Sequence, residues 1–527
     1  MRKTFLLTAV GSMALGLLTL TACPRSGKED RYTNDGKLIV SVRNLYFDAY
    51  RGGDAYLDEI EDMFGLKFDL SSYEWANWST QVYGTVNGDS VEDVFHANID
   101  SYNFSSQYKF WADEEVIKPL PDDLSRWPNI KRMIDNTSNI DALKLNGKLY
   151  GIPIAKDTTD YSTSYSPFTY IYRRDWAKKW GVYQPDDEYT WAQFEALLEK
   201  FRVELAPSNR FALADVEWGY PSIPNFYKQV PHCFAQDSTG KYVNNYTTDA
   251  YIAGMNEARD FMRNGWYHRA QNTAADGFMN KQYYSNQVGV LYENLSYTNF
   301  VNLKTQLRKM NASVTGFNVD DALAIMRIKG ENGKYALEGT DNWFSMTFFD
   351  YKISDTKQEK ILDVLDWLLG EEGTTFAVYG FEGYDYVKEG GQIKIQEEYW
   401  PKDNDGQYAP KDNGGRYLRY LVSLGYDLLP KDPLTDKAAI DYLNEWDAEM
   451  RQHLTDGDLR VLKENAEVMW LTTPKKSEHS GNLRDTALKH VMKYTYSQEI
   501  LDETAFKGKF GSLWTQVLDE INTALGK

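Results

Sequence analysis

The feature that most constrains the fold is an alternation of strand-like and helix-like segments near the start of the chain. Residues 38–42 form a compact apolar run, residues 56–64 place apolar side chains at helical spacing, and residues 66–70 alternate apolar and polar positions. A third apolar run covers residues 91–97. A strand, a helix and a second strand in this order form a βαβ unit, whose strands lie parallel in one sheet. The pattern therefore predicts an α/β fold built around a parallel sheet.

The length of the chain predicts more than one folded unit. The chain has 527 residues, whereas a single hydrophobic core stops growing near ~250–300 residues. We therefore expect at least two lobes, and a ligand site between lobes becomes possible.

Candidate binding residues lie just after the predicted strands. In open α/β sheets, ligands bind outside the carboxyl ends of the strands. Trp75 and Trp78 follow the second predicted strand, and Asn98 and Asp100 follow the third. Flat aromatic faces mixed with short hydrogen-bonding side chains suit a ligand that is rich in hydroxyl groups.

Later loops offer candidates of the same kind. Trp218 and Tyr220 lie in an aromatic turn. Glu293 and Asn294 follow another predicted strand, and Trp343 precedes an apolar run. Loop residues of this kind are favoured over core residues for binding. The alternative for each aromatic residue is that it covers the core from a loop.

Composition argues against some partners and leaves others open. The formal net charge is −19, from 58 basic and 77 acidic residues, and such a surface repels nucleic acid and anionic lipid. Aromatic residues make up 15% of the chain. Aromatic faces stack on sugar rings, but large proteins also bury aromatic residues, so their abundance alone does not separate the two roles.

The first residues have the layout of a secretory signal. Arg2 and Lys3 precede an apolar run over residues 4–20, and small residues follow. Residues 20–23, Leu-Thr-Ala-Cys, resemble a bacterial lipobox, whose cysteine is acylated and becomes the mature N-terminus. The resemblance implies that Cys23 carries lipid such as palmitate and holds the protein on the extracellular face of the cell membrane. The alternative is an ordinary secretory signal with a cysteine near its cleavage site.

The segment after this signal is expected to be flexible. Residues 24–35 are polar and charged without an apolar period, which predicts a tether between the membrane and the folded body. The chain has two cysteines. If Cys23 is acylated, Cys233 has no cysteine partner, and we expect no disulfide.

Four later motifs together resemble a known family. They occupy residues 146–153 (Asn-Gly-Lys-Leu-Tyr-Gly-Ile-Pro), 173–176 (Arg-Arg-Asp-Trp), 190–191 (Thr-Trp) and 379–386 (Tyr-Gly-Phe-Glu-Gly-Tyr-Asp-Tyr). Their order and spacing resemble the extracellular solute-binding proteins of carbohydrate ABC transporters, known as family 1, and in particular its branch of long lipoproteins. One departure is Asp385, where this branch commonly has histidine, so no side-chain role is carried over to that position.

The resemblance implies a two-lobed, periplasmic-binding-protein-like fold of type II with a ligand cleft between the lobes. We expect residues 36–155 and 285–350 in the first lobe, and residues 156–284 and 351–527 in the second. The implied function is capture of a carbohydrate, which we expect to be an oligosaccharide, by lobe closure. The implied partners are ABC transporter permease subunits, and the implied protein is a monomer without cofactor or catalysis.

Local patterns make smaller predictions without the family. Residues 146–148 form a turn, and Ile152-Pro153 requires an extended exit, as in a hinge strand. Thr190 and Gln193 have the spacing of a helix capping box. Trp446 and Trp514 lie on apolar helical faces, which predicts buried packing rather than ligand contact.

Motifs for catalysis and metal binding were sought in the sequence and are absent. There is no phosphate-binding loop, dinucleotide fingerprint, nucleophile elbow or His-Glu-x-x-His. His232 and Cys233 are adjacent, so they cannot easily reach one zinc ion. Residues 403–406 lack the ligand spacing of a calcium loop. We therefore expect no metal.

Two other functions remain compatible with the sequence. A surface-anchored glycoside hydrolase would share the anchor, the acidity and the aromatic residues, and would need two carboxylates facing each other at ~5–10 Å. A sugar-sensing partner of a membrane kinase is the third possibility. The sequence does not distinguish which sugar binds.

Overall fold

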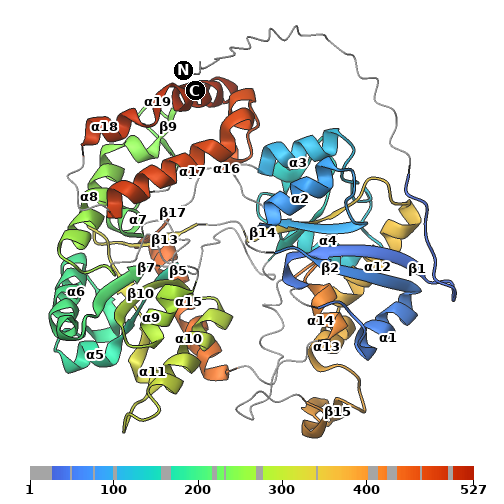
Figure 1. Cartoon of the computed structure of the whole chain (residues 1–527), viewed down its shortest axis with the longest axis horizontal. Coiled ribbons are helices and arrows are strands. Elements are labelled where there is room, and N and C mark those ends of the chain that lie inside the picture. Colours follow the sequence, from blue (N-terminus) through green and yellow to red (C-terminus); the bar gives the residue numbers. More distant parts are fainter. Residues whose placement is uncertain are drawn as a thin grey trace, which may run out of the picture.

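The computed structural model describes residues 27–47, 50–74, 77–98, 104–155, 168–215, 222–230, 233–268, 277–339, 342–400, 413–423, 436–462, 466–496 and 502–527. Within these ranges the chain forms two α/β lobes that lie side by side (Figure 1). No helix in this part of the chain combines the length and the apolar character that a membrane-spanning segment requires.

The first lobe is built on a five-stranded sheet. Its strands, in spatial order, are β2 (Leu66–Ser72), β1 (Leu38–Asn44), β3 (Val94–Asn98), β14 (Trp343–Phe349) and β4 (Ile152–Ala155). β1 runs parallel to both β2 and β3, and β14 runs antiparallel to its neighbours β3 and β4. The parallel pairing of the first three strands confirms the predicted α/β class.

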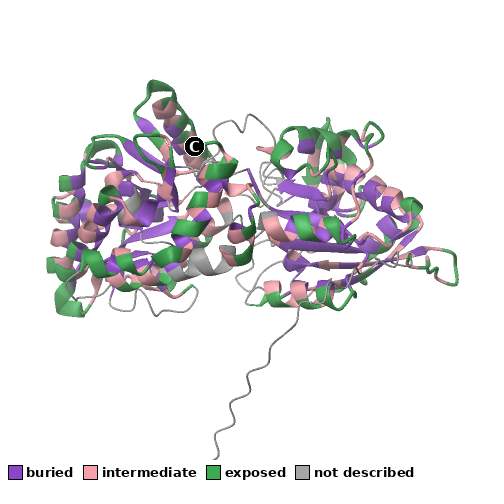
Figure 2. Ribbon diagram, turned by 90° about the horizontal axis from the view of Figure 1, so that it is seen from above, coloured by how far each residue is buried: buried purple, intermediate pink, exposed green. Residues whose placement is uncertain are grey.

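Helices lie on both sides of this sheet. On one side are α2 (Trp78–Asn87) and α3 (Phe104–Asp113), and Trp111 of α3 contacts Phe95 and Phe348 edge to face. On the other side are α1 (Ala55–Phe64), α12 (Asp355–Leu369), α13 (Glu371–Tyr379) and α14 (Gly414–Arg419) (Figure 1). α4 (Pro128–Asp135) packs against α12. The strands between these layers are largely buried (Figure 2).

The second lobe is built on a four-stranded sheet. Its strands, in spatial order, are β11 (Leu323–Ile325), β5 (Phe168–Arg173), β10 (Val288–Asn294) and β7 (Phe211–Asp215). β10 runs parallel to β7 and antiparallel to β5. The helices of this lobe include α5 (Arg174–Lys179), α6 (Trp191–Leu205), α7 (Ser222–Lys228), α8 (Asp249–Arg263), α9 (Phe278–Tyr284), α10 (Tyr297–Met310), α11 (Val319–Ala322) and α15 (Lys437–Asp456).

The C-terminal helices pack against α8 and extend the second lobe. They are α16 (Ala466–Met469), α17 (Pro474–Tyr496), α18 (Glu503–Gly508) and α19 (Gly511–Ala524). Trp514 of α19 and Trp446 of α15 are both buried, which confirms the packing role predicted for them. The capping box at the start of α6 is also confirmed, because Thr190 and Gln193 make both reciprocal bonds.

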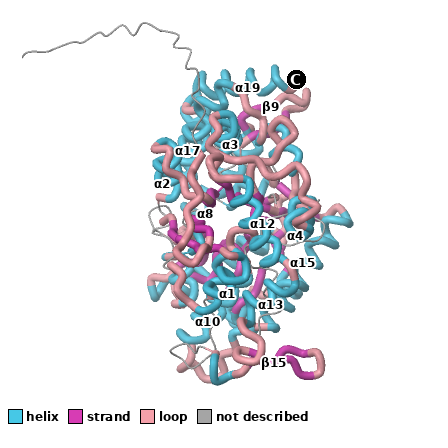
Figure 3. Tube along the Cα trace, turned by 90° about the vertical axis from the view of Figure 1, so that its right-hand side faces the viewer, coloured by secondary structure: helices cyan, strands magenta, loops and turns pink. Residues whose placement is uncertain are grey.

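Short two-stranded sheets complete the fold. The pairs are β6 (Glu188–Tyr189) with β12 (Arg327–Ile328), β8 (Phe234–Gln236) with β9 (Tyr242–Asn244), β13 (Tyr335–Glu338) with β17 (Leu459–Leu462), and β15 (Tyr386–Glu389) with β16 (Gln392–Ile395). The β15–β16 hairpin projects from the end of the first lobe (Figure 3).

The predicted lobe boundaries are wrong after residue 284. β10 pairs with β5 and β7, so residues 288–294 belong to the second lobe and not to the first. The chain returns to the first sheet only with β14. Residues 355–422 then supply α12–α14 and part of the first core, where the prediction placed the second lobe. A buried apolar strand fits either sheet, so the sequence pattern did not identify its partners.

The predicted flexible tether is also wrong for the residues that the structure describes. Lys28 donates its backbone N–H to the Lys352 carbonyl at 2.9 Å. Its ammonium group lies 2.6 Å from Asp350 and 3.3 Å from Asp93, and both carboxylates are buried. The polar composition of this segment therefore reflects ion pairs with the first lobe rather than a solvated linker.

Candidate functional site

In both sheets, the carboxyl ends of the parallel strands lie on the side of the lobe where the chain passes to the other lobe. β4, which runs in the same direction as β3, ends at Ala155, and the next described residue, Phe168, begins β5. In the second sheet Phe168 lies opposite Asn294, the last residue of β10. Each lobe therefore places its strand ends next to a crossing segment, which is where ligands bind in open α/β folds.

Neutral polar residues lie on one face of the first sheet, at the end where the parallel strands β1 and β3 terminate. We call this end the first edge, and we call the group the first-lobe polar cluster: Asn44, His96, Asn98 and Ser345. Ser345 lies directly opposite Asn98 in the register of β14 and β3. Asn44 lies two residues beyond Val42, and His96 two residues beyond Val94, and Val42 and Val94 are paired. All four side chains therefore project from the same face of the sheet, in neighbouring positions.

The first-lobe polar cluster has unused hydrogen-bonding capacity. Asn44, His96 and Ser345 are fully buried, and Asn98 is half-buried. Asn44 Nδ2, both His96 ring nitrogens, Asn98 Oδ1 and Ser345 Oγ have no hydrogen-bond partner. Buried polar groups are almost always paired in native proteins, so this concentration at one edge calls for additional polar partners.

Aromatic residues cover the same edge, and the histidine there stays uncharged. The Tyr46 ring lies 5.2 Å from the His96 ring and 5.7 Å from Tyr420, which follows α14. Burial lowers the pKa of His96 to about 3. The imidazole is therefore neutral at physiological pH, and it offers one donor and one acceptor.

Acidic residues of the second lobe lie at or beside the ends of β7 and β10, and we call them the second-lobe carboxylates: Asp215 in β7, Glu293 in β10 and Glu338 at the end of β13. Asp215 ends β7 and accepts hydrogen bonds from the hydroxyl groups of Ser222 at 3.1 Å and Tyr267 at 3.0 Å. Tyr292 donates to Glu338 at 3.2 Å. Burial, followed by the charge of Glu338, raises the pKa of Tyr292 well above its ordinary value. This tyrosine therefore remains a donor.

Several predicted site residues lie at these edges. Asn98 is a member of the first-lobe polar cluster. Glu293 is 1% exposed, and its Oε1 accepts from the Asn294 N–H at 2.6 Å. Trp78 begins α2 and packs, half-buried, on the first core. Trp75, Asp100, Trp218, Tyr220 and Cys23 lie outside the described residues.

Trp343, which the sequence suggested as a binding residue, is covered in this structure and offers no open aromatic face. It is 3% exposed, and its indole N–H donates to the Ser138 carbonyl at 2.9 Å. Its ring stacks on Trp470, with 5.3 Å between centroids. The ammonium group of Lys476 donates to the carbonyls on both sides of Trp470 and so fixes that loop. A ligand could contact Trp343 only if Trp470 moved.

The Trp343–Trp470 stack also joins the two lobes. Trp343 begins β14 of the first lobe, whereas Trp470 follows α16 of the second. Beside it, Ser106 of α3 donates to Ser477 of α17 at 3.0 Å. These contacts bring the C-terminal helices of the second lobe against the first lobe.

Sequence reasoning missed His96 and Asp215. His96 lies within a strand whose other residues are mostly apolar, and Asp215 ends the run Phe-Ala-Leu-Ala. A polar residue inside a buried apolar strand was the available signal, because burying such a group is costly unless it is paired.

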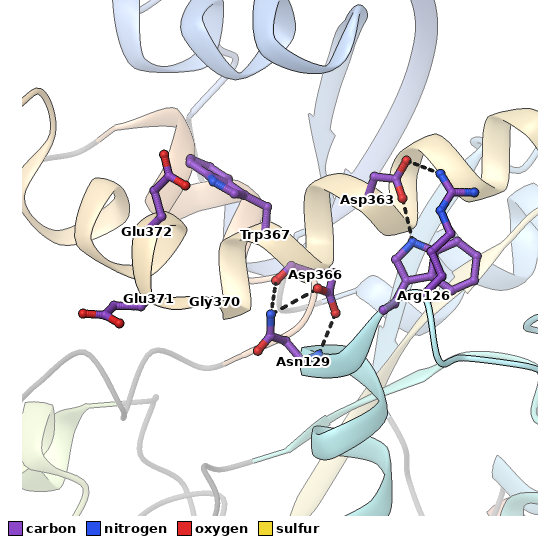
Figure 4. Close-up of a pocket in the computed structure, with 9 residues that line it drawn as sticks. Arg126, Asn129, Asp363, Asp366, Trp367, Gly370, Glu371 and Glu372 are labelled. Carbon is purple, nitrogen blue, oxygen red and sulfur yellow. Dashed lines mark hydrogen bonds and ion pairs between the residues drawn. The ribbon is translucent and has the colours of Figure 1, made fainter.

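A hollow of about 340 Å³ lies on the first lobe between α4, α12 and α13 (Figure 4). Its carboxylates serve mainly to join these helices. Asp366 accepts from the backbone N–H groups of Asn129 and Ile130 at the start of α4. Asp363 accepts from the Trp127 indole at 2.8 Å and pairs with Arg126. We therefore assign this hollow a structural role.

Asp385, the position where the motif departs from the family pattern, is structural here. It is fully buried and accepts from the Tyr56 hydroxyl at 2.9 Å and from the Phe381 N–H at 2.7 Å. Gly380 has a φ of +86°, and a Cβ there would meet Asp385 at 2.2 Å. The motif therefore packs a turn against α1.

Across the described ranges, no group of three or more His, Cys, Asp or Glu residues is placed to hold a metal ion. Residues 403–406 and His232 lie outside those ranges. Cys233 is buried, with its sulfur 3.1 Å from the Tyr246 hydroxyl.

Comparisons with known proteins support the fold from structure rather than from sequence. No protein-family model matches the chain, and no curated protein matches it. Solved structures match nearly its whole length. The alginate-binding protein AlgQ2, solved without calcium ion, has a TM-score of 0.65 at 14% identity, covering 93% of this chain and 98% of that one.

Two further solved structures extend the comparison. An HMO-binding, ABC-transporter-associated solute-binding protein from Bifidobacterium longum infantis has a TM-score of 0.63 at 15% identity, with 93% and 98% coverage. The N-glycan transport solute-binding protein NgtS from Streptococcus pneumoniae has a TM-score of 0.56 at 14% identity, with 92% and 97% coverage. The chain thus has the two-lobed α/β fold of periplasmic-type solute-binding proteins, and the fold expected from the sequence motifs is confirmed.

Proposed function

We propose that this protein is the extracellular solute-binding component of an ABC importer and that it captures a carbohydrate, in particular an oligosaccharide. The observation that carries the proposal is the end-to-end similarity of fold to three solute-binding proteins whose names refer to alginate, HMO and N-glycan. Fold alone does not define a function. The proposal therefore also rests on the chemistry of the two sheet edges.

The residues at these edges suit a ligand rich in hydroxyl groups. The first-lobe polar cluster supplies amide, imidazole and hydroxyl groups, and the second lobe supplies carboxylates and tyrosines. Each type hydrogen-bonds readily to sugar hydroxyls. A ligand that contacts both edges favours the closed arrangement of the lobes, because only closure allows both sets of contacts at once.

We further propose that Cys23 is acylated and that the protein acts as a monomer on the extracellular face of the cell membrane, where it meets the permease subunits. The lipobox-like sequence supports the anchor. Since Lys28 is already fixed to the first lobe, only about five residues connect the anchor to the folded body. Fully extended, five residues span at most ~18 Å.

The hydrolase alternative has less support from the described residues. A glycosidase needs two carboxylates on opposite sides of the scissile bond. Asp215, Glu293 and Glu338 all come from the second lobe, and Asp215 and Glu338 already accept hydrogen bonds from hydroxyl groups. We therefore retain binding without catalysis as the proposed function.

Isothermal titration against a panel of oligosaccharides and peptides tests this proposal. We expect micromolar or tighter binding to at least one oligosaccharide, together with a smaller radius of gyration in solution scattering when it is bound. Binding to peptides but to no saccharide would contradict the proposed substrate class. Release of reducing ends from a bound saccharide would support the hydrolase instead.

A further inference from the structure

We propose that the site takes an uncharged oligosaccharide and discriminates against uronic acids and other anionic sugars. The inference rests on the proposed function and narrows its substrate class. It does not follow from the comparisons, because the solved neighbour AlgQ2 is an alginate-binding protein.

The first-lobe polar cluster lacks hydrogen-bond partners of both kinds, donors and acceptors. Asn98 Oδ1 is an acceptor without a donor, and Asn44 Nδ2 is a donor without an acceptor. Both atoms are buried in this structure, so a ligand reaches them only when the residues that cover them move. A sugar hydroxyl both donates and accepts, so it can then satisfy either atom. An ionised carboxylate in the same position only accepts, so it cannot pair with Asn98 Oδ1. Leaving a buried polar group without a partner opposes binding.

The first-lobe polar cluster carries no charge. The central strands β1, β3 and β14 contribute Asn44, Asn98 and Ser345, which are neutral, and burial keeps His96 neutral as well. None of these four side chains can form an ion pair with an anionic sugar. Such a pair is the usual means of holding a carboxylate away from water.

The second lobe adds negative charge near the proposed site. Asp215 and Glu293 place carboxylates at the ends of β7 and β10, Glu338 at the end of β13 lies beside them through its contact with Tyr292, and the whole chain carries a net charge of −19. Carboxylates accept hydrogen bonds from sugar hydroxyls but repel a ligand carboxylate. One like-charge pair about 8 Å apart weakens binding roughly 30-fold in a medium of dielectric constant ~20.

Among the described residues, Arg43 of β1 and Arg51 beside β2 are basic groups near this edge, and their contacts hold them away from the first-lobe polar cluster. Arg43 projects from the opposite face of β1, where it pairs with Glu92 at 3.5 Å and lies over the Tyr73 ring. Arg51 lies beside the outer strand β2, where its Nη2 donates to Ser72 Oγ at 2.8 Å. Arg51 is therefore the residue to remove when testing whether an anion can be held at this edge.

The test compares two probes that differ only at C6, namely β-1,4-mannotetraose and β-1,4-tetramannuronate, within the same saccharide panel. The tightest neutral binder from the panel is also oxidised at its primary hydroxyl groups, which gives a second matched pair. We expect the neutral member of each binding pair to bind at least 30-fold more tightly. A uronate that binds as tightly as its neutral partner overturns the inference while the proposed function stands.

Variants locate the effect in the first lobe. Asn98→Ala should weaken binding of the neutral ligand about 5- to 20-fold, because the substitution removes a hydrogen-bonding amide from the first-lobe polar cluster. Asn87→Ala, which removes an exposed amide from the end of α2, should leave affinity unchanged. Uronate binding that is lost in Arg51→Gln would assign Arg51 as an anion site and contradict the inference. If no saccharide binds at all, the proposed function itself fails.

Discussion

At the scale of single residues, a carboxyl pair on the second lobe links stability to pH. Glu195 of α6 interacts with Glu257 of α8, and the Glu257 carboxylate accepts from the Trp191 indole at 2.7 Å. Burial, followed by the charge of Glu257, raises the pKa of Glu195 to about 7. The folded protein therefore binds a proton here that the unfolded chain, with an ordinary glutamate pKa of ~4.3, has already released at neutral pH.

We predict that the free energy of unfolding falls as the pH rises. The raised pKa means that this contribution is fully present below about pH 4 and is lost as the pH approaches and passes 7. Glu195→Gln should remove this part of the pH dependence, because the amide cannot ionise. Urea denaturation at pH 5 and pH 8 measures the difference, and parallel pH profiles for the two proteins would contradict the prediction. Glu371→Gln, at an exposed position of α13, is the control.

Single residues also explain why the site was only partly predictable. Asn98 was found because it directly follows a predicted strand, where the chain direction alone places it at the sheet edge. Trp343 was expected to be a loop residue that precedes an apolar run, yet it is covered by Trp470, which is distant in the sequence. A local pattern predicts where a side chain leaves the backbone, but it does not predict which distant residue covers it.

At the scale of elements, the N-terminal segment behaves as part of the first lobe. The Asp93 carboxylate is buried, which by itself raises its pKa, but the Ser41 N–H and then the Lys357 and Lys28 ammonium groups lower it below its ordinary value. Lys28 closes this network from outside the sheet. The network holds residues 27–35 against the ends of β3 and β14.

We predict that Lys28→Ala releases this segment. The substitution leaves two buried carboxylates with one cation fewer, so we expect a loss of about 1–3 kcal/mol in the free energy of unfolding. Amide hydrogen exchange over residues 27–40 should become faster, while exchange in the second lobe stays the same. Lys131→Ala removes an exposed ion pair on α4 and should change stability by less than about 0.5 kcal/mol. Unchanged amide hydrogen exchange in Lys28→Ala would show that Lys28 does not hold this segment against the first lobe.

Strand β10 shows which part of the fold could be predicted from the sequence and which part could not. The run over residues 288–292 was correctly predicted as a strand, because its apolar residues require burial on both faces. Its assignment to the first lobe was wrong, because the partners of a strand are set by register and packing with β5 and β7. Those contacts depend on residues more than 70 positions away in the sequence.

At the scale of the whole molecule, an aromatic stack is among the contacts that join the two lobes within the described residues. Trp343 and Trp470 come from different lobes, and Lys476 fixes the loop that carries Trp470. A stacked aromatic pair contributes about 0.5–1.5 kcal/mol beyond the area that it buries. The stack therefore favours the arrangement of lobes in which it forms.

We predict that Trp470→Ala shifts the balance between lobe arrangements. Losing about 0.5–1.5 kcal/mol changes the ratio of two arrangements by roughly 2- to 13-fold. Distances between spin labels on α2 and α15 should broaden in the ligand-free protein, and Trp470→Phe should preserve the narrower distribution because it retains a ring. Identical distributions in all three proteins would show that the stack does not restrain the lobes.

The sequence by itself determined the class of fold, the early strands and the helix ends, since these depend on apolar periodicity and on capping contacts between near neighbours. It also placed Asn98, Glu293 and Asn294 at strand ends, because strand direction is a local property. Only the tertiary structure decided which sheet receives β10, which residue covers Trp343, and that Lys28 binds buried carboxylates. These outcomes are contacts between distant segments, whose free energy depends on packing and desolvation in three dimensions.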